Sequence, residues 1–332
     1  MILNISIKIY LIMLKVKNMF NNQDFTRERT KYLGGSDIGA ILGLSKYRSA
    51  VDVWMEKTGK TVSLKDSLPL RCGQFAEDFV AREYALATGY ALIKHEKAMI
   101  HPQYAYMQGH IDRLVAEEGG ALMNAQGQAR RILECKTANP FAQSDWGEIG
   151  TDQVPLTYLV QCAWYMMLSN IDQTDLAVLF GNADFRIYAI QRDAELEQMI
   201  FERTIDFWEN HVVKDLPPKA VSELDYQQLF RQSSPSKAIE ADSETAALIQ
   251  KLGNLNQRIE QYEIEVSQMK QGIMARMQDA EVLTLQGKTL ATWRAPKPTL
   301  RIDSKRLTEE HPDLVALYQV PIQNSRRLVI KS

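Results

Sequence analysis

The sequence predicts an α/β or α+β fold in which helices pack around a short mixed sheet, with a core of about 200 residues. Segments of helical periodicity alternate with short runs rich in β-branched and aromatic residues. A hydrophobic content of 45% in 332 residues is sufficient for a large core. This composition excludes disordered, collagen-like and disulfide-scaffold proteins.

Capping residues and glycine stops delimit the first helices. Ser36 and Asp37 are good N-caps for a short helix, and Gly59 and Gly89 are good stops for the next two. The predicted helices cover residues 37–42, 50–58 and 73–88.

Strand-like segments follow these helices. Strands are predicted over residues 91–100, 104–115 and 131–136, with a glycine-rich hairpin turn at 117–129. A helix over 152–169, two strands over 175–180 and 185–191, and a helix over 193–213 complete the predicted core, which we assign to residues 21–215.

The C-terminal third has a different organisation. Residues 216–240 are rich in Pro, Ser and Gln, which is typical of a linker. A helix over 241–280 follows, with apolar residues at alternating spacings of four and three. These are Leu248, Leu252, Leu255, Ile259, Tyr262, Val266, Met269 and Ile273. Such a coiled-coil seam requires a partner, either a second helix of the same chain or the same helix of another subunit.

The last segment, residues 281–332, is predicted to be a small basic α+β region. Its strand-like pieces, 282–295 and 326–331, surround a helical piece at 311–319. No second cluster of acidic residues occurs in the sequence of this region, so we expect an accessory or partner-binding role.

Charge is unevenly distributed along the chain. The net charge is −2, but residues 1–48 carry +5, residues 281–332 carry +4 and the middle carries −11. This pattern excludes a uniformly basic nucleic-acid coat and indicates an acidic, metal-collecting centre with basic flanks. The three cysteines lack CxxC spacing, which argues against a zinc ribbon or an iron–sulfur cluster and favours a reducing, cytoplasmic setting.

The first twenty residues are apolar, but Lys8, Lys15 and Lys17 interrupt them. The uninterrupted run is shorter than the roughly 18 residues of a spanning helix, and no A-x-A cleavage site follows it. We expect residues 1–20 to be a disordered or non-native extension, with Met19 as a candidate start; a signal or anchor is the alternative.

The strand ILECK carries the strongest chemical signal. Because side chains alternate along a strand, Glu134 and Lys136 share one face, and Asp112 on the preceding strand is expected to lie beside them. Paired carboxylates suit Mg²⁺ or Mn²⁺, which can activate water for attack on a phosphodiester, and a lysine can stabilise the developing charge. The alternative is a solvated Glu134–Lys136 ion pair.

Neighbouring polar residues extend this candidate site. Glu77 on the helix over 73–88 is a candidate third acidic ligand, although a surface helix glutamate is the commoner role. Gln161 and Tyr165 are four residues apart, hence on one face of a mostly apolar helix. They are candidates to contact the substrate backbone or a metal-bound water.

A glycine turn before the first helix is a candidate phosphate site. Gly35 and Ser36 stand where backbone N–H groups can bind an anion, with Arg29 as a further donor. A simple helix cap is the alternative reading.

Taken together, these motifs resemble the YqaJ-like phage recombinase nucleases, relatives of lambda exonuclease in the PD-(D/E)XK superfamily. The motifs, in chain order, are GGSDIGAILGLSKYRSAVDVWMEKTG, GQFAED, GHIDR, ECK and QCAWY. The resemblance extends over roughly residues 29–215. One departure is that Ile111 precedes Asp112, whereas the PD-(D/E)XK motif has proline before its aspartate.

The resemblance implies a PD-(D/E)XK, restriction-endonuclease-like core and specific residue roles. Asp112, Glu134 and Lys136 match the catalytic triplet, and Glu77 matches the helical acid. Gln161 and Tyr165 match the Gln-x-x-x-Tyr motif. Ser36 and Arg29 match the pair that holds the 5′ phosphate, with Arg27 or Arg48 as alternatives to Arg29.

The implied activity is Mg²⁺-dependent 5′-to-3′ digestion of linear double-stranded DNA, which leaves a 3′ overhang for a single-strand annealing protein. Lambda-type relatives form ring-shaped trimers, so a homo-oligomer is also implied, in the cytoplasm of a bacterial host. Two alternatives are an endonuclease of the same superfamily and a non-catalytic scaffold that binds DNA ends.

Overall fold

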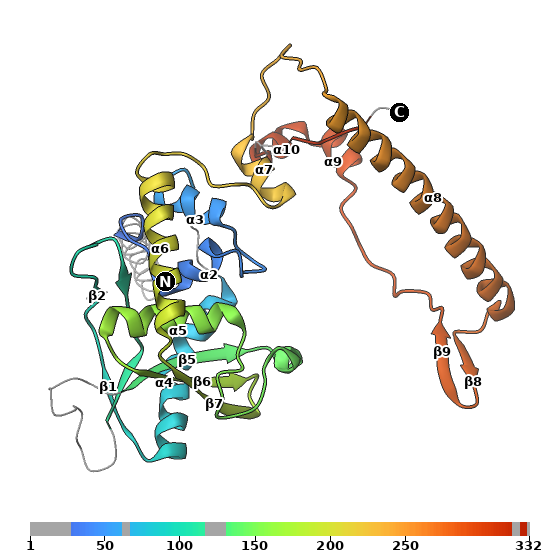
Figure 1. Cartoon of the computed structure of the whole chain (residues 1–332). Helices are drawn as coiled ribbons and strands as arrows, with labels where there is room; N and C mark the ends of the chain where they lie inside the picture. The colour runs from blue at the N-terminus through green and yellow to red at the C-terminus, as the bar shows by residue number, and fades with distance from the viewer. Residues whose placement is uncertain (1–27, 62–66, 117–130, 321–325, 331–332) are drawn as a thin grey trace, which may run out of the picture. The chain divides into compact units, whose positions relative to one another are not determined.

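The computed structural model describes residues 28–61, 67–116, 131–320 and 326–330. The chain divides into two compact units, residues 1–229 and 230–332, which are described separately below (Figure 1). Within the described residues, no helix combines the length and apolar character needed to cross a membrane. The predicted hairpin turn at 117–129 and the extension at 1–20 lie outside the described residues.

A five-stranded mixed sheet forms the centre of the first unit. Its order is β1 (Ala91–Lys94), β4 (Arg113–Ala116), β5 (Arg131–Ala138), β6 (Gln173–Phe180) and β7 (Asp184–Gln191). Only β5 and β6 pair in parallel; the other neighbours are antiparallel. The predicted α+β class, a short mixed sheet flanked by helices, is therefore confirmed.

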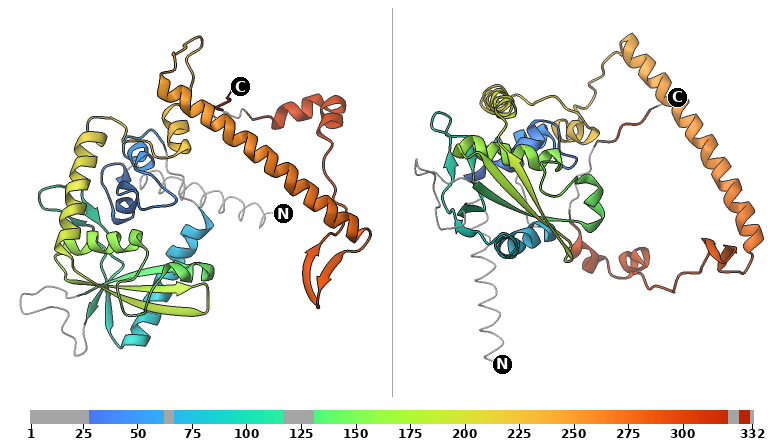
Figure 2. Two further views of the ribbon diagram at one scale, coloured as in Figure 1. Left: turned by 45° about the vertical axis from the view of Figure 1, so that its right-hand side comes forward. Right: turned by 60° about the horizontal axis from the view of Figure 1, so that its bottom comes forward.

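Helices cover both faces of this sheet (Figures 1 and 2). On one face, α4 (Leu68–Thr88) packs Val80, Ala81 and Tyr84 against Leu133 and Cys135 of β5. On the other face, the buried side chains of α5 (Leu156–Ser169) pack against alternate residues of β5 and β6. The strand β5 is thus buried on both sides, as expected for a central strand.

A layer of shorter elements lies next to α5. The helices α2 (Gly35–Ile41) and α3 (Ala50–Lys57) pack together, and α2 also packs on α5. The helix α6 (Ala194–Asp206) continues into a wide turn, η2 (Phe207–Val212). A separate two-stranded sheet joins β2 (Met99–Ile100) to β3 (Gln108–Gly109), and a short helix, η1 (Pro140–Asp145), follows β5.

The structure corrects several predicted boundaries. The strand predicted over 91–100 is two pieces, β1 and β2, and the one predicted over 104–115 is β3 and β4, because β2 and β3 leave the main sheet to pair with each other. The helix predicted from 73 begins at Leu68, since Ser67 accepts a hydrogen bond from Leu70 N–H as N-cap. The helix predicted from 152 begins after Pro155.

The segment predicted as a linker, 216–240, contains the helix α7 (Glu223–Leu229), which belongs to the first unit. Buried Asp225 accepts a hydrogen bond of 2.6 Å from Ser49 Oγ, and Gln228 donates one of 2.9 Å to Asp52. The linker prediction missed α7 because these contacts join residues far apart in the sequence.

The second unit consists mainly of the 35-residue helix α8 (Ser243–Met277), in the region where the heptad helix is predicted. A hairpin of β8 (Val282–Leu285) and β9 (Lys288–Thr292) follows it. Two short helices, α9 (Ser304–Glu310) and α10 (Pro312–Tyr318), come next. The strand predicted at 326–331 is not formed by its described residues, 326–330.

The buried side chain of Asp175 on β6 ties α4 to the sheet. Its carboxylate accepts hydrogen bonds from Tyr84 Oη at 2.5 Å and from Arg131 at 2.9 Å.

We expect Tyr84→Phe to lower the free energy of unfolding by about 1.5 kcal/mol, since a hydrogen bond to a charged group is lost. Urea denaturation of the full chain measures this. The control Tyr47→Phe, at a side chain that is 97% exposed, should not change the midpoint. Equal midpoints for Tyr84→Phe and wild type would contradict the role given to this bond.

Candidate active site

The strand β5 presents Glu134 and Lys136 on the face covered by α5. Cys135 and Leu133 point to the opposite face and pack against α4. The predicted alternation is therefore present. Lys136 Nζ donates a hydrogen bond of 2.5 Å to Glu134 Oε1, so the two side chains also form an ion pair, but a largely buried one and not the solvated pair considered as the alternative.

Glu134 is the most enclosed acid of this group, with only 2% of its surface exposed. Gln161 Nε2 on α5 donates to Glu134 Oε1 at 2.8 Å and to Tyr165 Oη at 3.0 Å. The i, i+4 spacing of Gln161 and Tyr165 thus places both on the face of α5 that meets β5. The two residues therefore face the acid rather than the apolar core alone.

Asp112 lies just before β4, next to Glu134. The pairing of Arg113 with Leu133 puts Asp112 at the register of Glu134 on the neighbouring strand. Asp112 Oδ2 accepts a hydrogen bond of 2.8 Å from Cys135 N–H. The structure therefore brings Asp112, Glu134, Lys136, Gln161 and Tyr165 together.

Burial raises the pKa of both acids. Burial, followed by the charge of Glu134, raises the pKa of Asp112 to about 8. Burial also raises the pKa of Glu134, although Lys136 opposes the shift. Burial alone would lower the pKa of Lys136, but Glu134, Tyr165 and Asp112 outweigh it and raise that pKa, so the ammonium stays charged.

Glu77 makes its hydrogen bond to Arg113 and not to these acids, although its charge contributes to the raised pKa of both Asp112 and Glu134. It lies on α4, across the sheet from Glu134, and its Oε1 accepts a hydrogen bond of 2.8 Å from Arg113. Arg113 is buried, pairs with Asp78 as well, and donates to the carbonyl oxygen of Asp112.

The donor set of Asp112 and Glu134 fits a hard divalent cation. Glu134 Oε2 is buried and has no hydrogen-bond partner among the residues that the structure describes. An orphaned carboxylate oxygen beside a second carboxylate is the environment in which Mg²⁺ or Mn²⁺ offsets charge. Within the described part of the chain, however, no three acidic, His or Cys side chains form a ready-made metal cluster.

The predicted phosphate turn is built against this site. A Cβ on Gly35 would lie 2.8 Å from ring atoms of Tyr165, so glycine allows the start of α2 to contact α5. The N–H of Gly34 is already capped by Asp37 Oδ2 at 3.0 Å, and Gly35 is buried. The exposed group of the turn is the side chain of Ser36, and Arg29 Nη2 lies 3.3 Å from its Oγ.

A cluster of charged side chains surrounds Asp37. Arg48 Nη1 and Lys57 Nζ contact the Asp37 carboxylate at 2.5 and 2.9 Å, and Arg29 Nη2 at 3.2 Å. Glu56 pairs with Arg48 at 2.6 Å. Burial opposes ionisation of Asp37, but the three cations outweigh it and hold the pKa of its carboxyl below the usual value. Three cations face two acids, so the cluster keeps one positive charge.

The site lies in a segment with known relatives. Residues 24–172 match the model of the YqaJ-like viral recombinase domain. This segment is similar to that family, so residues 24–172 are called the recombinase domain below. The uncharacterized protein YqaJ of Bacillus subtilis (strain 168) is 29% identical over 294 residues, which is 86% of this chain and 87% of that protein. Every residue assigned to the site lies inside the recombinase domain.

Two solved structures also have partial similarity to the chain. An alkaline exonuclease from Laribacter hongkongensis is 15% identical, with a TM-score of 0.46 over 58% of this chain and 94% of that one. A phage-related exonuclease from Haemophilus somnus 129PT is 16% identical, with a TM-score of 0.41 over 55% and 96%.

Two features of the recombinase domain were missed from the sequence. The first is Arg113, which holds Glu77 and Asp78; its only sequence signal is its place after Asp112 in GHIDR. The second is the pairing of Glu56 and Lys57 with Asp37, Arg29 and Arg48. Of the alternatives to Arg29, Arg48 belongs to this cluster, whereas Arg27 lies outside the described residues.

The contact between Gly35 and Tyr165 leads to a prediction for the recombinase domain. We expect Gly35→Ala to destabilise it by about 1–3 kcal/mol, because the added methyl group overpacks against the Tyr165 ring. Thermal unfolding followed by circular dichroism measures the change. Gly34→Ala is the matched control, since its Cβ would meet the nearest atom at 3.8 Å. If both variants unfold at the same temperature, the close approach is not what requires glycine.

Proposed function

We propose that this chain is a metal-dependent exonuclease that degrades one strand of linear double-stranded DNA from its 5′ end. The observation that carries the proposal is the buried Glu134 carboxylate. One oxygen is fixed by Lys136 and Gln161, and the other has no partner in the described part of the chain and lies in the same site as Asp112. A structural ion pair alone does not account for that second oxygen.

Asp112 and Glu134 are the residues that would hold Mg²⁺, with Mn²⁺ as a substitute. Bound there, the cation would act as a Lewis acid toward the phosphodiester and lower the pKa of a bound water. Gln161 fixes the rotamer of Glu134 through its 2.8 Å hydrogen bond, and Tyr165 in turn accepts from Gln161. Glu77, held on α4 by its pairing with Arg113, would be the third acid of the site.

Lys136 supplies the positive charge of the site itself. Its ammonium stays protonated, since neighbouring acids raise its pKa. It lies 2.5 Å from Glu134 Oε1 and can stabilise negative charge that develops on a phosphate held at the two acids. It can equally orient the attacking water.

Recognition of the DNA end is assigned to the first turn of α2. Ser36 Oγ is exposed and lies 3.3 Å from Arg29 Nη2, so both can donate to a terminal phosphate. The domain family and this geometry support digestion from the 5′ end, which would leave a 3′ overhang. A single-strand annealing protein would then bind that overhang, consistent with a recombinase role.

One assay distinguishes the proposal from its alternatives. Linear duplexes with 5′-phosphate or 5′-hydroxyl ends and a closed circle are incubated with Mg²⁺, Mn²⁺ or EDTA. We expect loss of the 5′-phosphorylated strand with either metal, no reaction in EDTA and an intact circle. Nicking of the circle would favour an endonuclease. Binding of ends without cleavage under any metal would favour a non-catalytic scaffold.

Removing the charge of either central residue should stop cleavage. We expect Glu134→Gln and Lys136→Met each to lower the rate about 10²-fold or more, because the first loses a charged ligand of the cation and the second loses the charge that stabilises the reacting phosphate. Steady-state digestion of labelled duplex measures the rate, and circular dichroism checks folding. Glu202→Gln, at an exposed acid of α6, is the control and should keep the wild-type rate. A folded Glu134→Gln enzyme with the wild-type rate would refute the site.

Ser36 gives a separate test of end recognition. We expect Ser36→Ala to reduce the preference for 5′-phosphate over 5′-hydroxyl ends at least about tenfold, since a hydrogen bond to a charged group contributes about 1.5–3 kcal/mol. The ratio of kcat/KM for the two ends is the measurement. Ser36 is chosen over Arg29 because Arg29 also contacts Asp37 and Glu56 in the buried cluster. An unchanged ratio would remove Ser36 from this role.

A further inference from the structure

The helix α8 carries a continuous apolar stripe that no described residue of its own unit covers. The eight heptad residues from Leu248 to Ile273 are each 38–67% exposed. They recur at spacings of four and three, so they lie along one side of the helix. An exposed apolar stripe of this length on a helix indicates an interaction surface.

Two interior residues also weaken the helix on its own. Gly253 and Gly272 lie in its interior, and each lowers helix stability relative to alanine. No close contact requires glycine at either position, since a Cβ there would have no neighbouring atom within 4 Å. Helices in proteins depend mostly on packing of an apolar face, so α8 requires a partner along its length.

Within the described residues of this unit, no other element matches α8 in length. The stripe from Leu248 to Ile273 is about 39 Å long at 1.5 Å per residue. The helices α9 and α10 have seven residues each, or about 10 Å. The strands β8 and β9 have four and five residues and pair with each other. The longest helix described in the first unit, α4, has 21 residues, or about 32 Å, so a second copy of α8 is the partner that matches the stripe over its full length.

The residue types at the seam select a two-stranded, parallel arrangement. In heptad terms, the a positions are Leu252, Ile259, Val266 and Ile273, and the d positions are Leu248, Leu255, Tyr262 and Met269. Three of the four a residues are β-branched, and none of the d residues is. β-Branched residues at a with unbranched or γ-branched residues at d favour parallel dimers.

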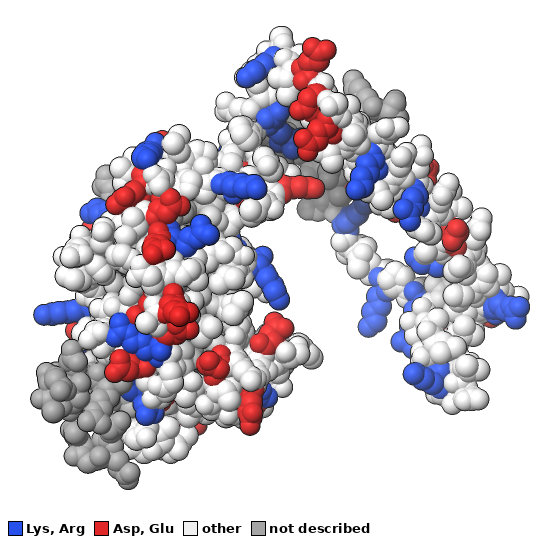
Figure 3. All heavy atoms as spheres, in the orientation of Figure 1, with Lys and Arg blue, Asp and Glu red and all other residues white. Residues whose placement is uncertain are grey.

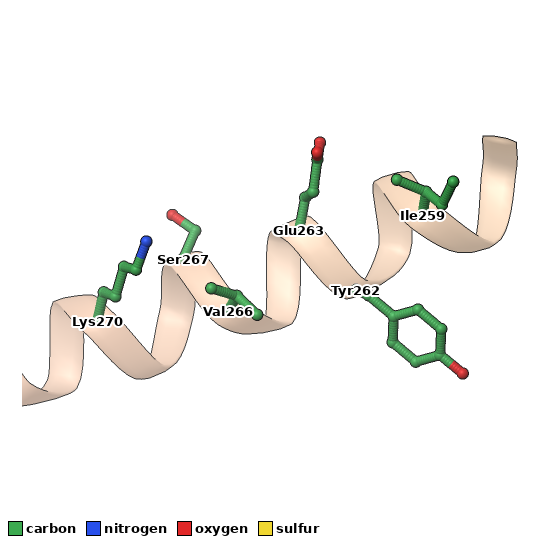
Figure 4. A pocket seen from close by; sticks show the side chains of 6 residues that line it. All are labelled: Ile259, Tyr262, Glu263, Val266, Ser267 and Lys270. Atoms are coloured by element: carbon green, nitrogen blue, oxygen red, sulfur yellow. The ribbon is translucent and has the colours of Figure 1, made fainter. Parts of the chain in front are cut away.

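The charges beside the seam complement a second copy of the same helix. In a parallel, in-register pair, each g residue faces the e residue five positions later on the other helix. Arg258 would then face Glu263 of the partner subunit, and Glu265 would face Lys270 of the partner subunit. Symmetry doubles both pairs, which gives four attractive contacts. Figure 4 shows Val266 between Glu263 and Lys270 along the helix, with Ile259 beyond Glu263. Figure 3 shows charges of both signs along α8.

We propose that two copies of this chain associate through α8 as a parallel, in-register, two-stranded coiled coil. The seam extends over nearly four heptads, Leu248 to Ile273. This dimer does not depend on the nuclease activity proposed above.

The first experiment measures the mass of the full chain in solution by light scattering and sedimentation equilibrium. We expect Ile259→Asp to halve the number of chains per particle, because it puts a charge at the centre of the seam. Ile264→Asp is the matched control: Ile264 is also an exposed isoleucine of α8, 52% against 54%, but lies off the seam. A monomeric wild-type chain would overturn the proposal, as would equal effects of the two variants.

The second experiment tests direction and register. Cys72 is the exposed cysteine, whereas Cys135 and Cys162 are buried, so Cys72→Ser provides the background. Leu252→Cys and Ile273→Cys are then introduced separately and the full chain is oxidised. We expect a disulfide-linked dimer from each, since equivalent a residues face each other within disulfide distance in a parallel pair. In an antiparallel pair centred near Tyr262, the two copies of Leu252 would be about 30 Å apart. Absence of the covalent dimer at either position, or a particle of three chains, would overturn the parallel dimer.

Discussion

The buried carboxylate of Glu134 is the constraint on which the first unit is organised. A carboxylate with 2% of its surface exposed is stable only if neighbouring groups replace its hydration. Lys136 and Gln161 do this for one oxygen. These two groups come from different elements, so β5 and α5 must meet at one relative position for the acid to be tolerated. The packing of α5 on β5 and the placement of this acid therefore depend on the same contacts.

The close approach of α2 to α5 follows from that position of α5. Tyr165 accepts from Gln161 and lies with its ring against Gly35, so the residue that supports the acid also fixes the start of α2. Any larger residue at 35 would separate the turn that carries Ser36 from the helix that carries Gln161. The candidate end-binding turn and the candidate catalytic acid are thereby held in one rigid arrangement, which suits an enzyme that must align a DNA terminus with the bond to be cut.

Local patterns were sufficient to predict some of this arrangement. Strand alternation predicted that Glu134 and Lys136 share a face, and helical spacing predicted that Gln161 and Tyr165 do. Both rules depend only on backbone geometry within one element. The contacts of Glu77 could not be predicted in this way, because its partner Arg113 lies on a different element and α4 is across the sheet from Glu134. The break between β1 and β2 and the packing of α7 were missed for the same reason: a distant strand or helix decides each of them.

The cluster around Asp37 explains how positive charge is kept near the turn without a basic surface. The first 48 residues carry +5, yet Arg29 and Arg48 are mostly buried and paired with Asp37 and Glu56. Three fully paired cations would have little attraction left for a phosphate, and three unpaired ones would not be stable at this depth. Two acids for three cations satisfy both conditions: the guanidinium groups are held in fixed positions, and one positive charge remains beside Ser36. Because a fixed donor loses less entropy on binding than a flexible one, this arrangement favours recognition of a phosphate by geometry as well as by charge.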